Sequence, residues 1–497
     1  METQKSILLV TVDCLRADHV GFLGYHSPTT PFLDSLAEES VVFPAAIVAG
    51  APTYYSLPAM LASRYPLAFG REVLGIGPNE ATIVSAFQRT GYATAAFCAA
   101  NPYISSRFGY AQGFDLFRDF LDEKEQRLPD ERGVLAKPGK EWAGRLNRSL
   151  ERASSSLGLR AVYDELYFRY CQRVTPVPEF TDALRPFPSA DVIVDHATEW
   201  LASIGNQPFF LWLHFMDPHA PYYPKDAALA LMREKTITPF RARYLNSFWN
   251  RSDLGVSRLA RRRKEIIALY DAAIRWVDVQ MARFVKSLQR AGTWENCILA
   301  FTADHGEEFL DHAGRYHPPS GLMEEVIRVP LLLRVPGRPK MHFDTSPFSM
   351  IHLGPTLLDS AGVSIPNSFE GRSWWPDLTE GARPDAVAFS ESVYGCTNPF
   401  HRENRMGHRI LSVRERRFKL VLNFDSGEED LYDLDKDPQE RAPLPRDAEK
   451  SVRRHLLQLA QAHLQRPIDR RMSMSQLLGD LQLEWSARAP KSSLVSC

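Results

Sequence analysis

The sequence predicts an α/β protein built on an open, mostly parallel β-sheet with helices on both faces. Continuous apolar runs, such as residues 6–12 and 208–216, are typical of strands that are buried on both sides. Segments with helical periodicity lie between such runs, and the clearest spans residues 264–288. Strands and helices that alternate in this way are typical of a parallel sheet sandwiched by helices.

The run SILLVTV at residues 6–12 is expected to form the first core strand. A helix should begin at Pro31, because Thr30 can cap it and proline fits the first helical position. A second helix over residues 81–91 should end at Gly91. Further strands are expected at residues 41–49, 92–100, 208–216, 297–303 and 328–336.

Two segments interrupt this alternation, and the pattern changes near the C-terminus. Residues 119–190 are interpreted as a charged insertion, partly helical near 145–172, and residues 225–262 as a second, irregular insertion. The last part should hold short strands and a helix, near residues 385–391, 409–413, 417–423 and 446–463. We therefore expect a main domain over residues 1–384 and a smaller C-terminal α+β domain over residues 385–497.

Charge and cysteine content exclude several classes of protein. The formal net charge of −1 over 497 residues gives no field that would attract a nucleic acid. The six cysteines are scattered without a CxxC pair, so we expect free, buried thiols and not a disulfide framework. The N-terminus lacks a signal-peptide pattern, and the apolar runs are far shorter than the ~20 residues of a membrane span. The chain is predicted to be soluble and cytoplasmic, although a secreted chain after signal removal would differ only in lacking Met1.

Polar residues stand at or just after the ends of four predicted strands, the edge where ligands gather in open parallel sheets. They are Asp13, Thr53, Asp217 with His219, and Asp304 with His305. The side chains of Asp13, Asp304 and His305 suit magnesium, calcium, manganese or zinc. The hydroxyl of Thr53 could be a fourth ligand, and a bound cation would make it a better nucleophile.

Four motifs resemble those of one enzyme family. They are ILLVTVDCLRADHVGFLGYHSPTTPFLDSLAEESVVF from residue 7, LHFMDPHAPY from residue 213, FTADHGEEFLDHAGRYH from residue 301 and EEDLYDLDKDPQE from residue 428. In order and spacing they resemble motifs of sulfatases, which belong to the alkaline-phosphatase-like superfamily. The resemblance implies an alkaline-phosphatase-like fold and a metal-dependent hydrolase of sulfate or phosphate esters.

The resemblance also implies roles for single residues. Asp13 and Asp304 match metal-binding carboxylates, and His305 stands where many sulfatases have asparagine but phosphatase-like members have histidine. His219 matches a residue that binds the transferred anion or protonates the leaving group. His317 lies near a second substrate-binding or metal-binding position.

The chain departs from the family at the nucleophile. The family motif Cys-x-Pro-Ser-Arg aligns with residues 53–57, TYYSL, which hold no cysteine to convert to formylglycine. Cys14 is no substitute, because it falls beside Asp13, where many members carry a second metal carboxylate. Thr53 is therefore the predicted nucleophile. The alternatives are a residue that organises the metal while water attacks, and a simple helix cap.

Other polar residues have plainer interpretations. Glu307 and Glu308 are expected at a solvated helix start, and His312 is a weaker candidate for the site. His219 could also do no more than order its own proline-rich turn.

We predict a hydrolase that holds one divalent cation, or two, and cleaves a small-molecule or glycan ester. The threonine and His305 slightly favour phosphate monoesters or diesters over sulfate esters. Two alternatives stay open: a transferase of the same fold that passes the group to an alcohol, and a non-catalytic relative that only binds ligands.

Overall fold

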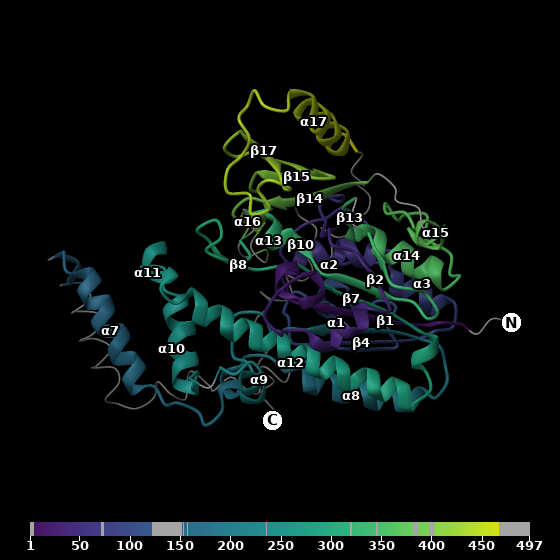
Figure 1. The fold of residues 1–497 in the computed structure, drawn as a ribbon, viewed down its shortest axis with the longest axis horizontal. Coiled ribbons are helices and arrows are strands. Elements are labelled where there is room, and N and C mark those ends of the chain that lie inside the picture. The colour runs from purple at the N-terminus through teal and green to yellow at the C-terminus, as the bar shows by residue number, and fades with distance from the viewer. Residues whose placement is uncertain are drawn as a thin grey trace, which may run out of the picture.

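The computed structural model describes residues 4–466, apart from 71–73, 122–151, 153, 157, 235, 319–320, 344–345, 381–385, 397–398 and 400–401. Its centre is an eight-stranded, mostly parallel sheet in the order β12-β2-β11-β7-β1-β6-β4-β5 (Figure 1). The strands are β1 (Ser6–Val12), β2 (Val41–Val42), β4 (Ala93–Cys98), β5 (Leu116–Arg118), β6 (Phe209–Phe215), β7 (Cys297–Ala303), β11 (Leu331–Arg334) and β12 (Met341–His342). The predicted fold class is confirmed.

Strand β1 lies between β6 and β7 and runs parallel to both. Every residue of these three strands is buried, as their continuous apolar runs predict. Val12 pairs with Phe215 on one side and with Ala303 on the other. The three chain segments therefore leave the sheet side by side, and this brings Asp13 next to Asp304.

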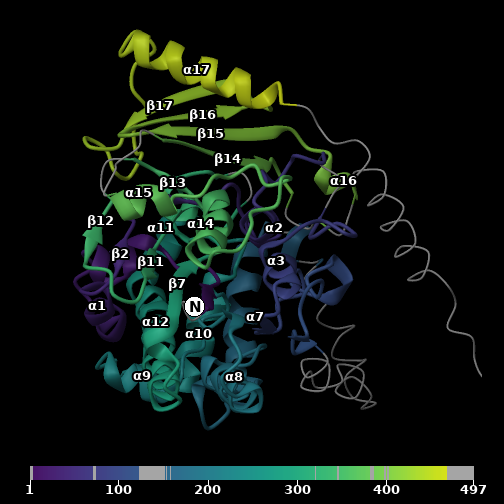
Figure 2. The same cartoon turned by 90° about the vertical axis from the view of Figure 1, so that its right-hand side faces the viewer.

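Helices cover both faces of the sheet (Figure 1, Figure 2). On one face α12 packs against α1, α8 and α9, and on the other α2, α3 and α14 pack together. Their bounds are α1 (Pro31–Ala37), α2 (Thr53–Ala62), α3 (Ile83–Arg89), α8 (Ala190–Ile204), α9 (Asp226–Leu231), α12 (Arg263–Arg290) and α14 (Leu353–Ser360). The apolar residues that recur over 264–288 form the buried side of α12.

A four-stranded antiparallel sheet, in the order β14-β15-β16-β17, follows on the C-terminal side. Its elements are β14 (Val387–Val393), β15 (Arg409–Glu415), β16 (Phe418–Asn423), β17 (Glu428–Asp433) and α17 (Lys450–Leu464), which packs across the strands (Figure 2). The strands and helix predicted for this part are confirmed. The predicted boundary between residues 384 and 385 lies outside the described residues and stays a prediction.

Buried charges join this sheet to the short helix α13 (Glu324–Ile327). Lys419 is fully buried, and its Nζ lies 2.6 Å from Glu440 Oε1 and 3.4 Å from Glu324 Oε1. Glu324 also pairs with Arg414, and its N–H donates to Glu440 Oε2 over 2.6 Å. Because an unpaired buried charge is strongly destabilising, these pairs hold the sheet against α13.

Prolines divide two predicted strands. Residues 41–49 form β2 and β3, which belong to different sheets, with Pro44 between them, and residues 328–336 form β10 and β11 around Pro330. The added elements are β3 (Ala46–Ile47) and β10 (Arg328–Val329). Proline has no N–H to donate to a neighbouring strand, which explains the divisions. Strand β11 runs antiparallel to β2 and β7, and the other strand pairs of the sheet are parallel, which fits the predicted mostly parallel sheet.

The insertion at residues 225–262 is more helical than expected, whereas α7 agrees with the helix expected near residues 145–172. Residues 225–262 are not irregular, because they hold α9, α10 and α11, and the described part of 119–190 holds α7, while residues 145–151 lie outside the described residues. The new helices are α7 (Arg160–Val174), α10 (Pro239–Trp249) and α11 (Val256–Ala260). Thr30 does precede α1, but its hydroxyl donates to the Asp34 carboxylate and does not cap the helix backbone.

Within the described ranges, no helix is both long and apolar enough to cross a membrane. The cysteines described there are all free. Four of them are buried, Cys171 is half-buried, and Cys497 lies outside the described residues.

Replacing Leu456 of α17 with alanine should lower the free energy of unfolding by about 2–5 kcal/mol. This leucine is fully buried in a cluster with Leu411, Leu420 and Leu431, so the change leaves a cavity. Chemical denaturation measures the effect. The exposed neighbour Gln458 provides the control, because Gln458→Ala should change stability by no more than about 0.5 kcal/mol. Equal losses in the two variants would contradict the packing of α17.

Candidate active site

Asp13 and Asp304 stand next to each other where β1 and β7 end, and both side chains are fully buried. The N–H of Cys14 points to Asp304 Oδ1 over 3.4 Å, and the N–H of His305 donates to the same oxygen over 2.9 Å. Among the described residues, none forms a hydrogen bond with Asp304 Oδ2. A buried carboxylate oxygen without a donor is unfavourable, so this atom is suited to a cation.

The electrostatics of the two carboxylates also suit a cation. Burial acts to raise the pKa of Asp13, but three nearby histidines outweigh it and hold this pKa well below its usual range. Burial, together with the neighbouring charge of Asp13, raises the pKa of Asp304. Two carboxylates this close repel each other when both are ionised, and a divalent cation removes that repulsion.

His305 and Thr53 complete the cluster. His305 Nδ1–H donates to the Gly306 carbonyl oxygen over 2.8 Å, which leaves Nε2 of the neutral ring with its lone pair. This Nε2 lies 3.1 Å from Thr53 Oγ1, 3.5 Å from Asp304 Oδ2 and 3.7 Å from Asp13 Oδ1. Thr53 is the first residue of α2, and its buried hydroxyl donates to Nε2. The structure therefore brings together the four residues predicted to bind the metal.

The segment that carries His305 is packed too tightly for a side chain at position 306. A Cβ placed on Gly306 would lie 1.9 Å from the carbonyl oxygen of Glu325. The N–H groups of Gly306 and Glu307 donate to the carbonyl oxygens of Val326 and Glu325 over 2.8 and 3.1 Å. This pairing with α13 holds His305 in place.

Sequence reasoning missed two residues that surround Asp13. Asn101 Nδ2 donates to Asp13 Oδ2 over 2.8 Å, and His214 Nε2 lies 3.4 Å from the same oxygen. Asn101 follows β4, so its position after another parallel strand is a signal that could have identified it. His214 lies inside the apolar strand β6, where its Nδ1 and Thr11 Oγ1 share a hydrogen bond of 2.8 Å.

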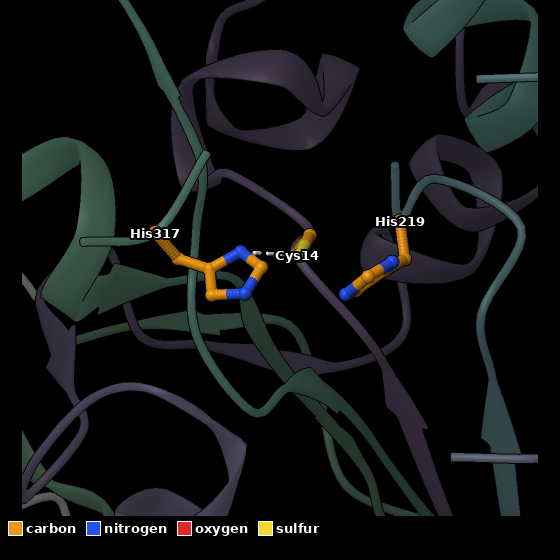
Figure 3. Close-up of side chains that lie close together, drawn as sticks. All are labelled: Cys14, His219 and His317. Carbon is orange, nitrogen blue, oxygen red and sulfur yellow. Dashed lines mark hydrogen bonds between the residues drawn. The ribbon is translucent and has the colours of Figure 1, made fainter. Parts of the chain in front are cut away.

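His219 and His317 line a cavity of about 500 Å³ beside the cluster, and Thr53 lines it too. The centres of the two imidazole rings are 5.3 Å apart, and Cys14 lies between them (Figure 3). A substrate in this cavity would contact both histidines and the hydroxyl of Thr53.

The expectation of a solvated helix start at Glu307 and Glu308 is wrong. Both side chains are buried, and Glu308 belongs to the strand β8 (Glu308–Phe309). Glu307 Oε2 accepts from His317 Nδ1 over 2.9 Å, and Oε1 accepts from the Tyr222 hydroxyl over 2.5 Å. Burial acts to raise the pKa of Glu307, but these hydrogen bonds and nearby imidazoles lower it overall. Glu307 is therefore an ionised carboxylate that orients His317.

Two of the candidates lie outside the cluster. Asp217 is buried, and its Oδ1 lies 2.5 Å from Arg185 Nη1. His312 Nδ1 donates to Glu325 Oε1 over 2.6 Å, and this bond raises the pKa of His312 to about 9. Both residues stabilise the segments around the site.

The fold and the cluster define an alkaline-phosphatase-like hydrolase. The profile of one family, described as Sulfatase, matches residues 5–363, and a second, described as N-sulphoglucosamine sulphohydrolase, C-terminal, matches residues 315–465. The chain therefore belongs to the sulfatase family, which makes it an enzyme of the sulfuric and phosphoric ester hydrolases. Enzymes of this family generally depend on a divalent metal ion, and the donors described above fit one.

Individual relatives agree with this assignment. An arylsulfatase of Clostridium perfringens is 25% identical over 465 residues, which cover 88% of this chain and 89% of the relative. An N-acetylglucosamine-6-O-sulfatase of Bacteroides thetaiotaomicron is 30% identical over 174 residues, 34% of this chain and 30% of the relative. The solved phosphonate monoester hydrolases of Agrobacterium radiobacter and Silicibacter pomeroyi have TM-scores of 0.65 and 0.67 at 21% and 19% identity. These two cover 93% and 94% of this chain and 95% and 96% of their own chains, which confirms the fold.

Manganese should stabilise the protein against heat, because the folded cluster binds the ion and the unfolded chain does not. At 100 times the dissociation constant, the gain in the free energy of unfolding is about 2.7 kcal/mol. Scanning calorimetry with and without manganese measures it. Asp304→Asn should lose this gain, whereas Asp195→Asn, a change at a surface ion pair with Arg283, should keep it. An equal gain in the Asp304 variant would exclude Asp304 as a ligand.

Proposed function

We propose that this protein hydrolyses a phosphate monoester or diester through attack of Thr53 Oγ1 on phosphorus. The position of Thr53 carries the proposal. Its hydroxyl lies 3.1 Å from His305 Nε2, which is 3.5 Å from Asp304 Oδ2 and 3.7 Å from Asp13 Oδ1. Thr53 also begins α2, and a helix start favours anions through its dipole and free N–H groups. A simple helix cap would not require this cluster, so the arrangement favours catalysis over the non-catalytic alternative.

The proposed reaction has two stages. In the first, Thr53 Oγ1 gives its proton to solvent water and bonds to phosphorus, while the bond between phosphorus and the alcohol oxygen breaks and that oxygen takes a proton from His219. In the second, water attacks the phosphothreonine and gives one proton back to His219, the bond to Thr53 Oγ1 breaks, and Thr53 takes a proton from solvent water. A divalent cation held by Asp13, Asp304 and His305, when bound, would lower the pKa of the hydroxyl and neutralise charge on the phosphoryl oxygens.

Two features favour phosphorus over sulfur. The sulfatase motif requires an oxidised cysteine, whereas Thr53 can attack as an alkoxide without any such modification. Phosphoryl transfer depends mainly on positioning the reactants and on neutralising charge, and a threonine beside a cation can meet both requirements. His305 supplies a third donor to the cation where many sulfatases have an amide. Phosphonate monoester hydrolases with the same fold give further support.

The lining of the cavity favours an uncharged alcohol part that contains a ring. Its walls include Tyr54, Tyr103 and Phe187, which suit an aryl group or a sugar ring. Apart from the histidines, Arg315 is the only cationic residue in the described lining. Its guanidinium donates to the Trp249 carbonyl oxygen, which is why we expect the alcohol part to be uncharged. A glycan ester is the second substrate class, which the relation to an N-acetylglucosamine-6-O-sulfatase supports.

Thr53→Ala should slow the hydrolysis of bis-p-nitrophenyl phosphate by manganese-loaded protein at least about 10³-fold, because it removes the attacking oxygen. Thr53→Ser keeps a hydroxyl and should retain a measurable part of the rate. Thr198→Ala is the matched control and should be unaffected, since the Thr198 hydroxyl only donates to the Val194 carbonyl oxygen within α8. Acid-quenched wild-type protein should carry one p-nitrophenyl phosphoryl group on the peptide that contains Thr53, as measured by mass spectrometry, because attack on this diester releases only one of its two p-nitrophenol groups.

Other outcomes decide between the alternatives. Full activity of Thr53→Ala would exclude Thr53 as the nucleophile. Turnover of p-nitrophenyl sulfate, lost in the same variant, would replace phosphorus with sulfur. Faster turnover with added alcohol, together with a phosphorylated alcohol as product, would indicate a transferase.

A further inference from the structure

Three side chains that could bind a transition metal meet beside the carboxylate cluster. Cys14 follows β1, His219 follows β6, and His317 follows β9 (Arg315–Tyr316). One ligand atom from each lies within 4.8 Å of the other two. Figure 3 shows an imidazole ring on either side of the thiol, and His317 Nδ1 is 3.3 Å from Cys14 Sγ.

Hydrogen bonds hold both rings with one nitrogen free. His219 Nδ1–H donates to the Ala220 carbonyl oxygen over 2.5 Å, and His317 Nδ1–H donates to Glu307 Oε2 over 2.9 Å. Nε2 is therefore the nitrogen of each ring that is left for a metal ion. His317 would have to turn Nε2 toward the thiol, because the nitrogen that lies 3.3 Å from Cys14 Sγ is Nδ1. A carbonyl or carboxylate behind the ring is the usual support of a metal-binding histidine.

We propose that Cys14, His219 and His317 bind a zinc ion. A thiolate with two imidazoles is a soft donor set that favours zinc over magnesium and manganese. Tetrahedral zinc, with bonds of about 2.3 Å to sulfur and about 2.0 Å to nitrogen, holds such donors about 3.5 Å apart. The ligand atoms lie within 4.8 Å of one another, so side-chain rotations must bring them to this separation when the ion binds. Because both histidines line the cavity, a position on the ion stays open to it.

The placement of Cys14 supports a dedicated role for its thiol. Cys14 has a φ of +62°, in the left-handed region that residues other than glycine rarely adopt. Its Sγ lies 3.1 Å from Asp13 Oδ1, so the zinc site adjoins the first cation site. Paired cations can stabilise both the attacking and the leaving oxygen of a phosphoryl group.

This inference deepens the proposed function and changes the role of one residue. Zinc on Nε2 excludes His219 as the proton donor to the alcohol, so water must supply that proton. The catalytic use of the zinc ion rests on the proposed function. Binding of the ion does not, and it can be tested without turnover.

Cobalt(II) is the probe, because its bond to a thiolate gives a sulfur-to-cobalt charge-transfer band in the near ultraviolet that carboxylate ligands do not give. The full chain is freed of metal with a chelator and titrated with cobalt, and bound cobalt is counted by mass spectrometry. Wild-type protein should bind two cobalt ions and show the band, which added zinc should remove. Cys14→Ser should bind one ion and lose the band, whereas Asp304→Asn should bind one and keep it.

Cys297→Ser is the matched control, since Cys297 is also fully buried but lies at the start of β7, the end opposite to Asp304. It should keep both ions and the band. A wild-type chain without the band, or a Cys14→Ser variant that keeps it, overturns the proposal. Circular dichroism checks folding, and if Cys14→Ser does not fold, His317→Gln takes its place with the same expected loss.

The Thr53→Ala variant separates this inference from the proposed function. It should keep the charge-transfer band while it loses turnover. A Thr53→Ala protein that keeps both the band and the turnover would overturn the proposed nucleophile and leave the zinc site standing.

Discussion

The parallel pairing of β1 with β6 and β7 is the constraint on which the site depends. Val12 is held between Phe215 and Ala303, so the residues that follow begin from fixed neighbouring positions. A slip of β7 by one residue would turn its buried side chains to the other face and carry Asp304 away from Asp13. Burial of the three strands on both faces prevents such a slip, because either face would lose its packing.

The residues that follow β1 and β7 at this edge of the sheet are held in energetically unfavourable arrangements. Two carboxylates lie close together out of water, Asp304 Oδ2 has no donor in the described chain, and Cys14 has a left-handed backbone. Such features persist only where the surrounding structure enforces them. Three imidazole rings at this edge have the same hydrogen-bond arrangement. His219, His305 and His317 each donate from Nδ1 to an oxygen acceptor behind the ring. The edge is thus arranged to receive positive charge.

Sequence patterns predicted the elements with a strong period or a long apolar run, namely β1, β6, β7 and α12. The predictions failed where the structure depends on contacts between residues far apart in the sequence, or where the sequence pattern covers only a few residues. Single prolines divide two runs that read as one strand each, and α9 and α11 are helices of only six and five residues. The predicted ligands converge because strand ends share one edge. Glu307 reads as a solvated acid, and its burial depends on Tyr222 and His317, which come from other segments of the chain.

The charged contacts of α13 make the two sheets of the protein interdependent. The backbone of α13 holds the segment with Gly306, whose neighbour His305 faces the cluster. The side chain of Glu324, from the same helix, pairs with Arg414 and the fully buried Lys419 of the smaller sheet. The smaller sheet is therefore not an interchangeable module, because truncation or a swap with a distant relative would strip Glu324 of its partners and loosen the backbone that positions His305.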